Sequence, residues 1–190
     1  GSSYELEEFL EAQCSSERFV EDDEAINESS RTFIPAPRET EADTNDDRHS
    51  QNRALKESLF LIVKKDRKDN AWGFPQGGRL FGEEMRECAS REFYEEVGVE
   101  EGEDLYYYGN APSAVHAYEY PKSHQERTGF FGAKVFYYKA YALDAPVGMD
   151  SLDKDEVIDY AWVRASEFPE YFDADFAMMM QRVVGSQGIQ

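Results

Sequence analysis

The stretch from Gly77 to Val99, which reads GGRLFGEEMRECASREFYEEVGV, decides the fold of this chain. Gly82 and Gly98 bracket a run of good helix formers that has acidic residues at its start, where the helix dipole favours them. A glycine at the far end suits the left-handed residue that commonly terminates a helix. The stretch therefore predicts one helix between these two glycines.

Three glutamates share one face of the expected helix. Glu92, Glu95 and Glu96 are three or four residues apart, so their side chains are neighbours on the helix surface. Such like charges repel unless water solvates them or a hard cation lies among them, and Mg²⁺ binds carboxylate oxygens together with substrate phosphates. A solvated acidic face is the alternative, but it gives no reason for the neighbouring Arg91 or for the glycines. The pattern therefore favours a site for Mg²⁺ or Mn²⁺.

The stretch resembles the Nudix box, G-x5-E-x7-R-E-Φ-x-E-E-x-G-Φ, with no fixed position missing. The fixed letters are Gly77, Glu83, Arg91, Glu92, Glu95, Glu96 and Gly98. The resemblance implies a Nudix phosphoanhydride hydrolase with an α/β fold, an α/β/α sandwich around a mixed β-sheet. It also implies the metal ligands, which are Glu92, Glu95, Glu96 and the backbone carbonyl of Gly77.

The resemblance implies catalytic roles for four residues. Glu83 and Arg91 would form an ion pair that orients the box loop over the helix, and an ordinary surface pair is the alternative. One carboxylate must take a proton from the attacking water, and the sequence does not choose between Glu96 and Glu156. Glu156 precedes Trp162 by the interval that separates the distal catalytic glutamate from its tryptophan in the family. It also lies in an acidic run, so a solvated charge is the alternative.

Two further segments resemble one branch of the family. Trp72 to Gly78, WGFPQGG, is similar to the lead-in of RNA 5′-pyrophosphohydrolases and asymmetric dinucleoside tetraphosphate hydrolases, and Tyr118 to Lys122, YEYPK, is similar to a downstream segment of that branch. The implied substrate is a 5′-triphosphorylated RNA end, or a dinucleoside polyphosphate or nucleotide. The expected substrate contacts are Trp72, Tyr118 and Phe130, which would stack on a base, and Lys122 and Arg127, which would bind phosphate. Core aromatic residues and exposed loop cations are the alternatives.

A second resemblance covers more of the chain. Five segments look like the mitochondrial large-subunit ribosomal protein L46 family, which has the Nudix fold and a decayed box. They are Phe33 to Ala36, Glu41 to Asp43, Asn52-Arg53, Gly109 to Pro112 and Gly132 to Phe136. In this chain the box is intact. The two resemblances together imply a Nudix hydrolase of the mitochondrial matrix that removes pyrophosphate from mRNA 5′ ends, of the kind called an edited-mRNA stability factor. A non-catalytic, ribosome-associated L46-like protein is the alternative.

The remaining sequence divides into an arm and a domain. Residues 1–50 are expected to form an acidic arm, partly extended or disordered, and residues 51–190 the Nudix domain. Apolar and aromatic runs predict strands at 58–63, 71–74, 105–108, 115–120, 133–143 and 158–163, with a closing helix at 173–184. Strands on both sides of a central helix agree with the α/β sandwich.

Charge limits the partners of the chain. Its formal net charge is −20, and residues 1–50 hold 15 acidic residues against 4 arginines. An acidic surface repels a polyphosphate backbone, which argues against DNA and predicts a separate RNA-binding protein partner for long RNA. The basic cluster, interpreted as a solvated turn or as a contact with RNA or a partner, is Arg53, Lys56, Lys64, Lys65, Arg67 and Lys68.

Two features bear on the compartment. Cys14 and Cys88 are too few for a disulfide framework, which predicts a reducing compartment. No apolar run approaches the length of a membrane span, so we expect no membrane partner.

Overall fold

The computed structural model of the chain describes residues 37–99, 105–142 and 147–185. The expectations for residues 1–36 lie outside this part. The strands are β1 (Leu59–Lys65), β2 (Trp72–Gly73), β3 (Leu105–Tyr107), β4 (Ala114–Glu119), β5 (Gly132–Tyr137), β6 (Ala140–Ala142) and β7 (Val157–Arg164). The helices are α3 (Glu41–Thr44), α4 (Met85–Val97), α5 (Lys122–Thr128), α6 (Phe168–Tyr171) and α7 (Ala174–Gly185), with the 3-10 turn η1 (Ala165–Glu167) before α6.

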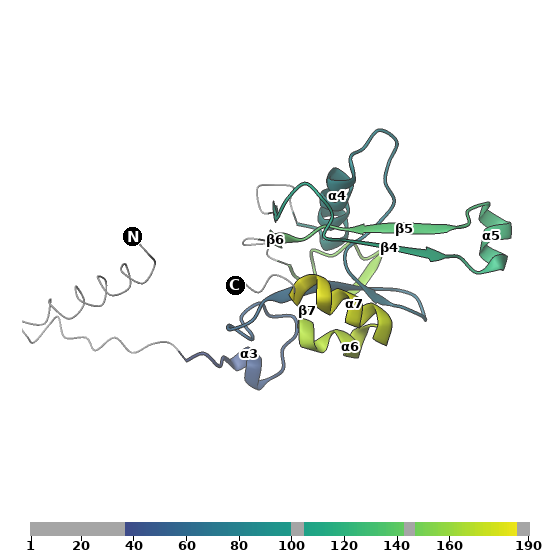
Figure 1. Ribbon diagram of the computed structural model, residues 1–190. Coiled ribbons are helices and arrows are strands. Elements are labelled where there is room, and N and C mark those ends of the chain that lie inside the picture. Colours follow the sequence, from purple (N-terminus) through teal and green to yellow (C-terminus); the bar gives the residue numbers. More distant parts are fainter. Residues whose placement is uncertain (1–36, 100–104, 143–146, 186–190) are drawn as a thin grey trace, which may run out of the picture. The chain divides into compact units, whose positions relative to one another are not determined.

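The central sheet, in the order β2-β1-β7, carries a core on each face. Side chains alternate along a strand, so neighbouring residues of β1 point to opposite sides. Leu61 and Val63 pack with Phe93 and Val97 of α4, whereas Ile62 packs on the side of α6 and α7. Figure 1 shows α4 on one side of the strands and α6 and α7 on the other. The expected α/β/α layering is therefore confirmed.

The strands of the described residues form three separate sheets. Besides the central sheet, β3 pairs with β6 and β4 pairs with β5, and every one of these pairings is antiparallel. A parallel pair, which a mixed sheet contains, is not among them. The sequence predicted one strand over residues 133–143, but the chain bends at Tyr138 and Lys139 because β5 and β6 have different partners. The helix α5, inserted between β4 and β5, was not predicted.

The helix predicted between Gly82 and Gly98 is α4. Its first turn is capped where the backbone N–H of Glu84 donates to the Glu87 carboxylate over 3.0 Å. Gly98 ends the helix in the left-handed region with φ of 67°. A Cβ on Gly98 would lie 1.4 Å from the carbonyl oxygen of Ser151, so only glycine lets the loop before β7 approach the end of α4. Cys88, expected to be buried in this helix, is 7% exposed.

A buried ion-pair network ties the segment before β1 to the sheet. The side chain of Arg53 is 4% exposed, and its guanidinium donates to both carboxylate oxygens of Glu167 over 3.0 and 2.6 Å. Arg164 donates to the same carboxylate over 2.8 Å. The compact unit accordingly begins at Arg38, ahead of the expected boundary at residue 51. Arg53 is thus a buried structural cation, and its expected place in a solvated basic cluster is wrong.

The charge on Glu167 should make stability depend on pH. Burial raises the pKa of Glu167, but hydrogen bonds from Arg53 and Arg164 outweigh burial and lower the pKa to about 2. A carboxyl with a lowered folded pKa stabilises the protein above its unfolded pKa, and this stability is lost as pH falls toward the folded pKa. We expect Glu167→Gln to lower the free energy of unfolding by about 3 kcal/mol at pH 7 and by much less near pH 3. Urea denaturation at several pH values measures this difference.

Glu57 supplies the control for that experiment. Its half-exposed carboxylate lies 3.6 Å from Arg164, outside the buried network. Glu57→Gln should change the free energy of unfolding by less than about 1 kcal/mol. Equal losses in the two variants, or a loss in Glu167→Gln that does not depend on pH, would contradict the assignment.

Candidate active site

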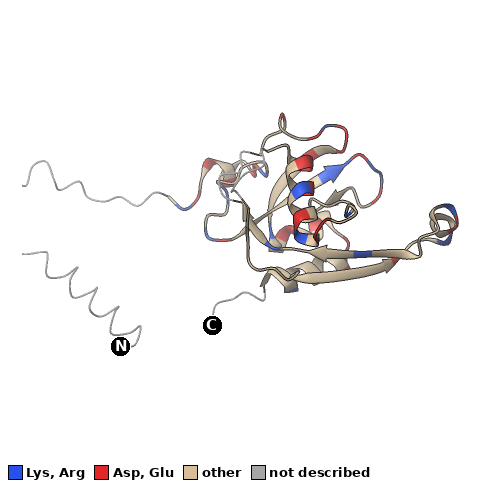
Figure 2. Cartoon of the chain, turned by 90° about the horizontal axis from the view of Figure 1, so that it is seen from above, with Lys and Arg blue, Asp and Glu red and all other residues tan. Residues whose placement is uncertain are grey.

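The three box glutamates differ sharply in burial. Glu96 is 1% exposed and Glu92 is 8% exposed, whereas the side chain of Glu95 is 57% exposed. All three come from the face of α4 predicted from their spacing. Figure 2 shows acidic and basic residues gathered around this helix and the neighbouring turns. The carboxylates thus meet a set of cations rather than open water.

Arg91 joins the box loop to three carboxylates. Its Nε donates to Glu83 over 2.8 Å, and one Nη donates to Glu92 over 2.8 Å and to Glu95 over 2.7 Å. The other Nη donates to the carbonyl oxygen of Gly78 over 3.0 Å. Every arm of the guanidinium is therefore used, and the expected pair between Glu83 and Arg91 is present in this structure.

Glu83 in turn fixes the loop. Its carboxylate accepts the backbone N–H of Leu80 over 2.8 Å. The hydrogen bonds from Arg91, and then the one from Leu80, lower the pKa of Glu83 to about 2. Glu83 therefore stays charged in any neutral solution and keeps the loop tied to α4.

Lys65, at the end of β1, is the counter-ion of the buried Glu96. Its ammonium lies 2.5 Å from Glu96 Oε1 and donates to the carbonyl oxygen of Gln76 over 3.2 Å. The backbone N–H of Gln76 donates to the other oxygen of Glu96 over 3.4 Å. Burial raises the pKa of Glu96, and the contacts with Lys65 and Gln76 oppose that rise. β1, the box loop and α4 thus meet at one carboxylate.

The residues of this site fit a hard divalent cation by the chemistry of their donors. Gly77 lies against Glu92, since a Cβ on Gly77 would come within 1.9 Å of Glu92 Oε2. The missing side chain leaves a cradle lined by carboxylate and backbone oxygens, the donors that Mg²⁺ prefers. Within the described ranges no three acidic, histidine or cysteine side chains converge as a metal cage. The contacts explain this, because Arg91 binds Glu92 and Glu95 while Lys65 binds Glu96.

Glu156, the second expected base, lies apart from these contacts. It is exposed in the turn before β7. Its neighbour Val157 pairs with Lys65 in the ladder between β1 and β7, so the backbone at Glu156 is close to that of Lys65. The choice between Glu96 and Glu156 as the base therefore stays a matter for experiment.

Four of the five expected substrate contacts lie on one hairpin. Tyr118 is in β4, Lys122 and Arg127 are in α5, and Phe130 follows α5. In both Figure 1 and Figure 2 this hairpin extends from the domain and α5 lies at its far end, away from α4. Trp72, the fifth, lies in β2 and packs edge-on against Tyr171, with ring centroids 5.1 Å apart. The structure does not bring these residues to the box carboxylates.

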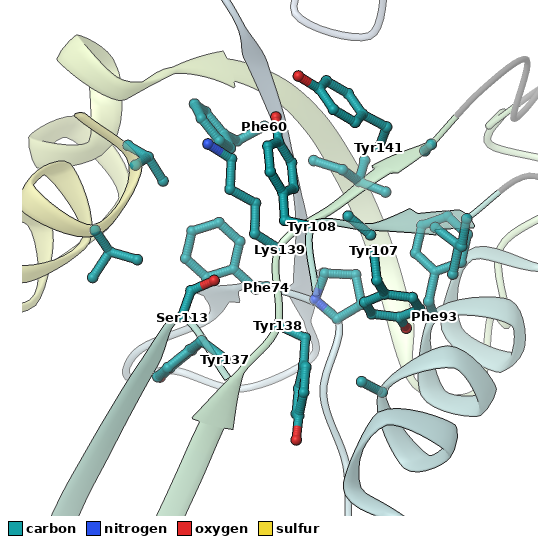
Figure 3. Close-up of a pocket in the computed structure, with 18 of the residues that line it drawn as sticks. Phe60, Phe74, Phe93, Tyr107, Tyr108, Ser113, Tyr137, Tyr138, Lys139 and Tyr141 are labelled. Carbon is teal, nitrogen blue, oxygen red and sulfur yellow. The ribbon is translucent and has the colours of Figure 1, made fainter. Parts of the chain in front are cut away.

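An aromatic cavity of about 300 Å³ adjoins the box loop. It separates β1 from β5 and β6, and Pro75 and Gln76 contribute to its wall, directly before Gly77. Ten aromatic rings line the cavity. The eight labelled in Figure 3 are Phe60, Phe74, Phe93, Tyr107, Tyr108, Tyr137, Tyr138 and Tyr141, and the other two are Phe136 and Trp162. Tyr108 stacks on Tyr141 with centroids 4.7 Å apart, and the Lys139 ammonium lies 4.6 Å from the Tyr108 centroid. A flat aromatic ligand suits such a lining.

Sequence analysis missed two parts of this site. Lys65 was grouped with a surface cluster, although a cation that ends a buried strand in a chain with three aligned glutamates was a usable signal. The cavity left no such signal. Aromatic residues at strand spacing predict a core equally well, and only the bend at Tyr138 opens the space between β1 and β6.

The fold and this site define an α/β domain that presents a glutamate-rich helix beside an aromatic cavity. The family model of the NUDIX domain matches residues 47–183, and the chain belongs to the NUDIX domain family. The large ribosomal subunit protein mL46 of Mus musculus is 30% identical over 159 residues, which cover 83% of this chain and 54% of that protein. The mL46 of Neurospora crassa is 30% identical over 179 residues, 87% of this chain and 47% of that protein. The chain spans about half the length of these relatives.

Two further similarities are more limited. An RNA pyrophosphohydrolase of Wolbachia pipientis is 38% identical over 65 residues, which cover 32% of this chain and 40% of that protein. A solved structure of a C. elegans Ap4A hydrolase binary complex has a TM-score of 0.51 at 20% identity, covering 67% of this chain and 84% of that chain. This structural likeness supports the fold. In the described ranges no helix combines the length and apolar character needed to span a membrane.

The contact between Lys65 and Glu96 should set stability when no divalent ion is present. We expect Lys65→Met to lower the free energy of unfolding by about 3 kcal/mol at pH 8, because it leaves a buried carboxylate without a counter-ion. Lowering the pH should reduce this loss, since a protonated Glu96 needs no counter-ion. Urea denaturation at pH 5 and pH 8 with a chelator gives both values.

The matched control is Lys64→Met. The Lys64 ammonium lies 5.6 Å from the Trp72 ring and contacts no box carboxylate in the described structure. Its removal should change the free energy of unfolding by about 1 kcal/mol or less. A Lys65→Met variant as stable as the parent at pH 8 would exclude the counter-ion role.

The close approach of Gly77 to Glu92 gives a separate prediction. We expect Gly77→Ala to displace the Glu92 carboxylate and to weaken Mn²⁺ binding by about tenfold to a hundredfold. Calorimetric titration of Mn²⁺ measures the change without requiring turnover. Gly73→Ala is the control, because a Cβ at Gly73 meets nothing within 4 Å. Unchanged Mn²⁺ affinity in Gly77→Ala would show that Glu92 and Gly77 do not form the metal site.

Proposed function

We propose that this protein is a divalent-metal-dependent Nudix hydrolase that removes pyrophosphate from the 5′-triphosphate end of RNA and leaves a 5′-monophosphate. The observation that carries the proposal is the alignment of Glu92, Glu95 and Glu96 on one face of α4, with the Glu92 carboxylate against the side-chain-free backbone of Gly77. Arg91 and Lys65 offset part of the negative charge, and the carboxylate oxygens are the donors that a hard divalent cation prefers. The membership of the family and the RNA pyrophosphohydrolase relative support the reaction class.

The metal ligands in this proposal are Glu92, Glu95, Glu96 and the carbonyl oxygen of Gly77. A bound Mg²⁺ or Mn²⁺ would polarise the phosphoanhydride and offset its negative charge. Arg91 holds two of the ligands in place from one side, and Lys65 holds the third. The chain thus keeps its carboxylates oriented toward the loop before any substrate arrives.

A carboxylate of the chain has to accept the proton of the attacking water. Glu96 is a buried candidate whose pKa is raised by burial, and Glu156 is an exposed one. A base works best when its pKa lies near the working pH, which favours Glu96. A carboxylate bound to a metal ion is a weaker proton acceptor, however, and Glu96 is also a proposed metal ligand. Glu156 is therefore the alternative base.

The aromatic cavity is the proposed site for the terminal base. Gln76 lines the cavity, and its backbone contacts Glu96. A base bound in the cavity would therefore lie next to Gly77, where the box loop begins. Tyr108 and Tyr141 supply stacked rings, and Lys139 supplies a cation at the rim. A dinucleoside polyphosphate or a free nucleotide offers the same base and phosphates, and its hydrolysis is therefore the second candidate function.

The setting of the enzyme is also a proposal. We place it in the mitochondrial matrix because its mL46 relatives match over most of this chain. With a net charge of −20, it needs a separate RNA-binding protein partner to hold long transcripts. The similarity to mL46 also favours a third candidate, a ribosome-associated protein without turnover.

Substrate competition separates these candidates. With Mg²⁺ present, we expect kcat/KM on 5′-triphosphorylated RNA to exceed kcat/KM on diadenosine tetraphosphate. Glu96→Gln should lower kcat by about two to four orders of magnitude if Glu96 is the base. Because Glu96 is also a proposed metal ligand, its variant should lose rate in either case, and Glu156→Gln identifies the base. This variant should show the large loss if Glu156 is the base and a small loss if Glu96 is.

The exposed Asp155 beside Glu156 provides a control. Asp155→Asn removes one charge from the same turn and should retain the parent rate. Faster turnover of the dinucleotide would identify the second candidate. No Mg²⁺-dependent turnover of either substrate, with no effect of Glu96→Gln, would identify the non-catalytic one.

A further inference from the structure

We propose that the hairpin formed by β4, α5 and β5 is a stacking platform for the single-stranded RNA that follows the 5′ end. Four rings form an aromatic row along one side of this hairpin, namely His116, Tyr118, Tyr120 and His124. The identity of the ligand as RNA rests on the proposed function, but the row itself is a separate surface outside the box.

The rings of the aromatic row are in continuous contact. His116 and Tyr118 have centroids 5.6 Å apart, Tyr118 and Tyr120 5.7 Å apart, and Tyr120 and His124 4.5 Å apart. In β4 the residues two apart share a face, which puts the first two rings on one side of the hairpin. The Tyr118 side of the row is open, since Tyr118 is 45% exposed. Tyr118 therefore has ring surface available for a base, and the other three rings are partly exposed.

The aromatic row begins where the cavity ends. His116 lies 6.1 Å from Phe176, which also lies 6.0 Å from Tyr137, a residue of the cavity wall. From Tyr137 the strand β5 runs back to Phe131, a distance of about 20 Å at about 3.3 Å per residue. A chain of nucleotides whose first base occupies the cavity can thus continue along the hairpin.

The hairpin is built to hold these rings in place. A Cβ on Gly132 would lie 2.2 Å from the carbonyl oxygen of Tyr118, so only glycine lets the two strands close at this point. The amide of Gln125 donates to the carbonyl oxygen of Tyr120 over 2.7 Å, which ties α5 to β4. The adjacent Phe130 and Phe131 are nevertheless 69% and 66% exposed. An ordered arm that displays large apolar side chains indicates an interaction surface.

The charges around the aromatic row favour RNA over a protein. Near the aromatic row the helix α5 carries Lys122 and Arg127 against Glu126, in a chain whose net charge is −20. Lys134 pairs with Ala117, so it lies on the other face of the strands, as Glu119 does. Arg127 contacts His124 over 3.2 Å, and Arg67 interacts electrostatically with Tyr118. Rings interleaved with cations bind single-stranded RNA, because bases stack on the rings while phosphates meet the cations. Figure 2 shows basic and acidic residues at the tip of the hairpin, with one further basic position part-way along a strand.

The experiment measures RNA binding without hydrolysis. The full chain, with a chelator present, is titrated against a fluorescent RNA of about ten nucleotides that has a 5′-hydroxyl and hence no phosphoanhydride. The double variant Tyr118→Ala with Tyr120→Ala should lose affinity by at least about tenfold, since one stacked base contributes about 1–3 kcal/mol. The double variant Tyr118→Phe with Tyr120→Phe keeps the rings and should bind like the parent.

Tyr106→Ala is the matched control. Tyr106 is 52% exposed in β3, outside the aromatic row, and its removal should leave RNA affinity unchanged. Thermal denaturation of each variant verifies that the domain remains folded. Where the alanine variant is unfolded, Arg127→Ala replaces it, and a loss of RNA affinity is again the expected result.

Three results would overturn the proposal. The first is parent-like RNA binding by the alanine variant, which would indicate that the aromatic row binds a protein partner instead. The second is an equal loss of affinity in the phenylalanine variant. The third is no RNA binding by the parent protein. None of them depends on turnover. A failure of the proposed function appears separately, as the absence of Mg²⁺-dependent hydrolysis of triphosphorylated RNA.

Discussion

One guanidinium group holds the site together. Arg91 donates to Glu83, Glu92 and Glu95 and to the carbonyl oxygen of Gly78, so it joins the box loop to α4 and spaces the carboxylates at the same time. Repulsion between the glutamates would otherwise favour exposure of all of them to water. The helix fixes the positions of the glutamate backbones, and the hydrogen bonds from Arg91 fix the positions of the carboxylate groups of Glu83, Glu92 and Glu95.

The second constraint is the burial of Glu96. A carboxylate that is 1% exposed is tolerated because Lys65 and the backbone of Gln76 contact it from two other segments of the chain. The arrangement couples three elements, β1, the loop and α4, through a single side chain.

The cavity lies next to both the carboxylates and the aromatic row. Gln76 connects the cavity to Glu96, and Tyr137 connects it through Phe176 to the rings of the hairpin. The mL46 relatives match most of the length of this chain. One fold can therefore occur both in a ribosomal protein and in a chain with an intact Nudix box. In this chain the glutamates of the box are intact, and Arg91 and Lys65 are their counter-ions.

The sequence by itself determined the helix α4, its boundary at Gly98, the α/β layering and the common face of Glu92, Glu95 and Glu96, because helical periodicity and glycine conformation are local properties. Only the tertiary structure decided which cations accompany the glutamates, that Arg53 is buried, and that β5 and β6 part to open the aromatic cavity. Contacts between segments far apart in sequence leave no periodic trace in either one. The partners of a buried charge become known only when the chain is folded.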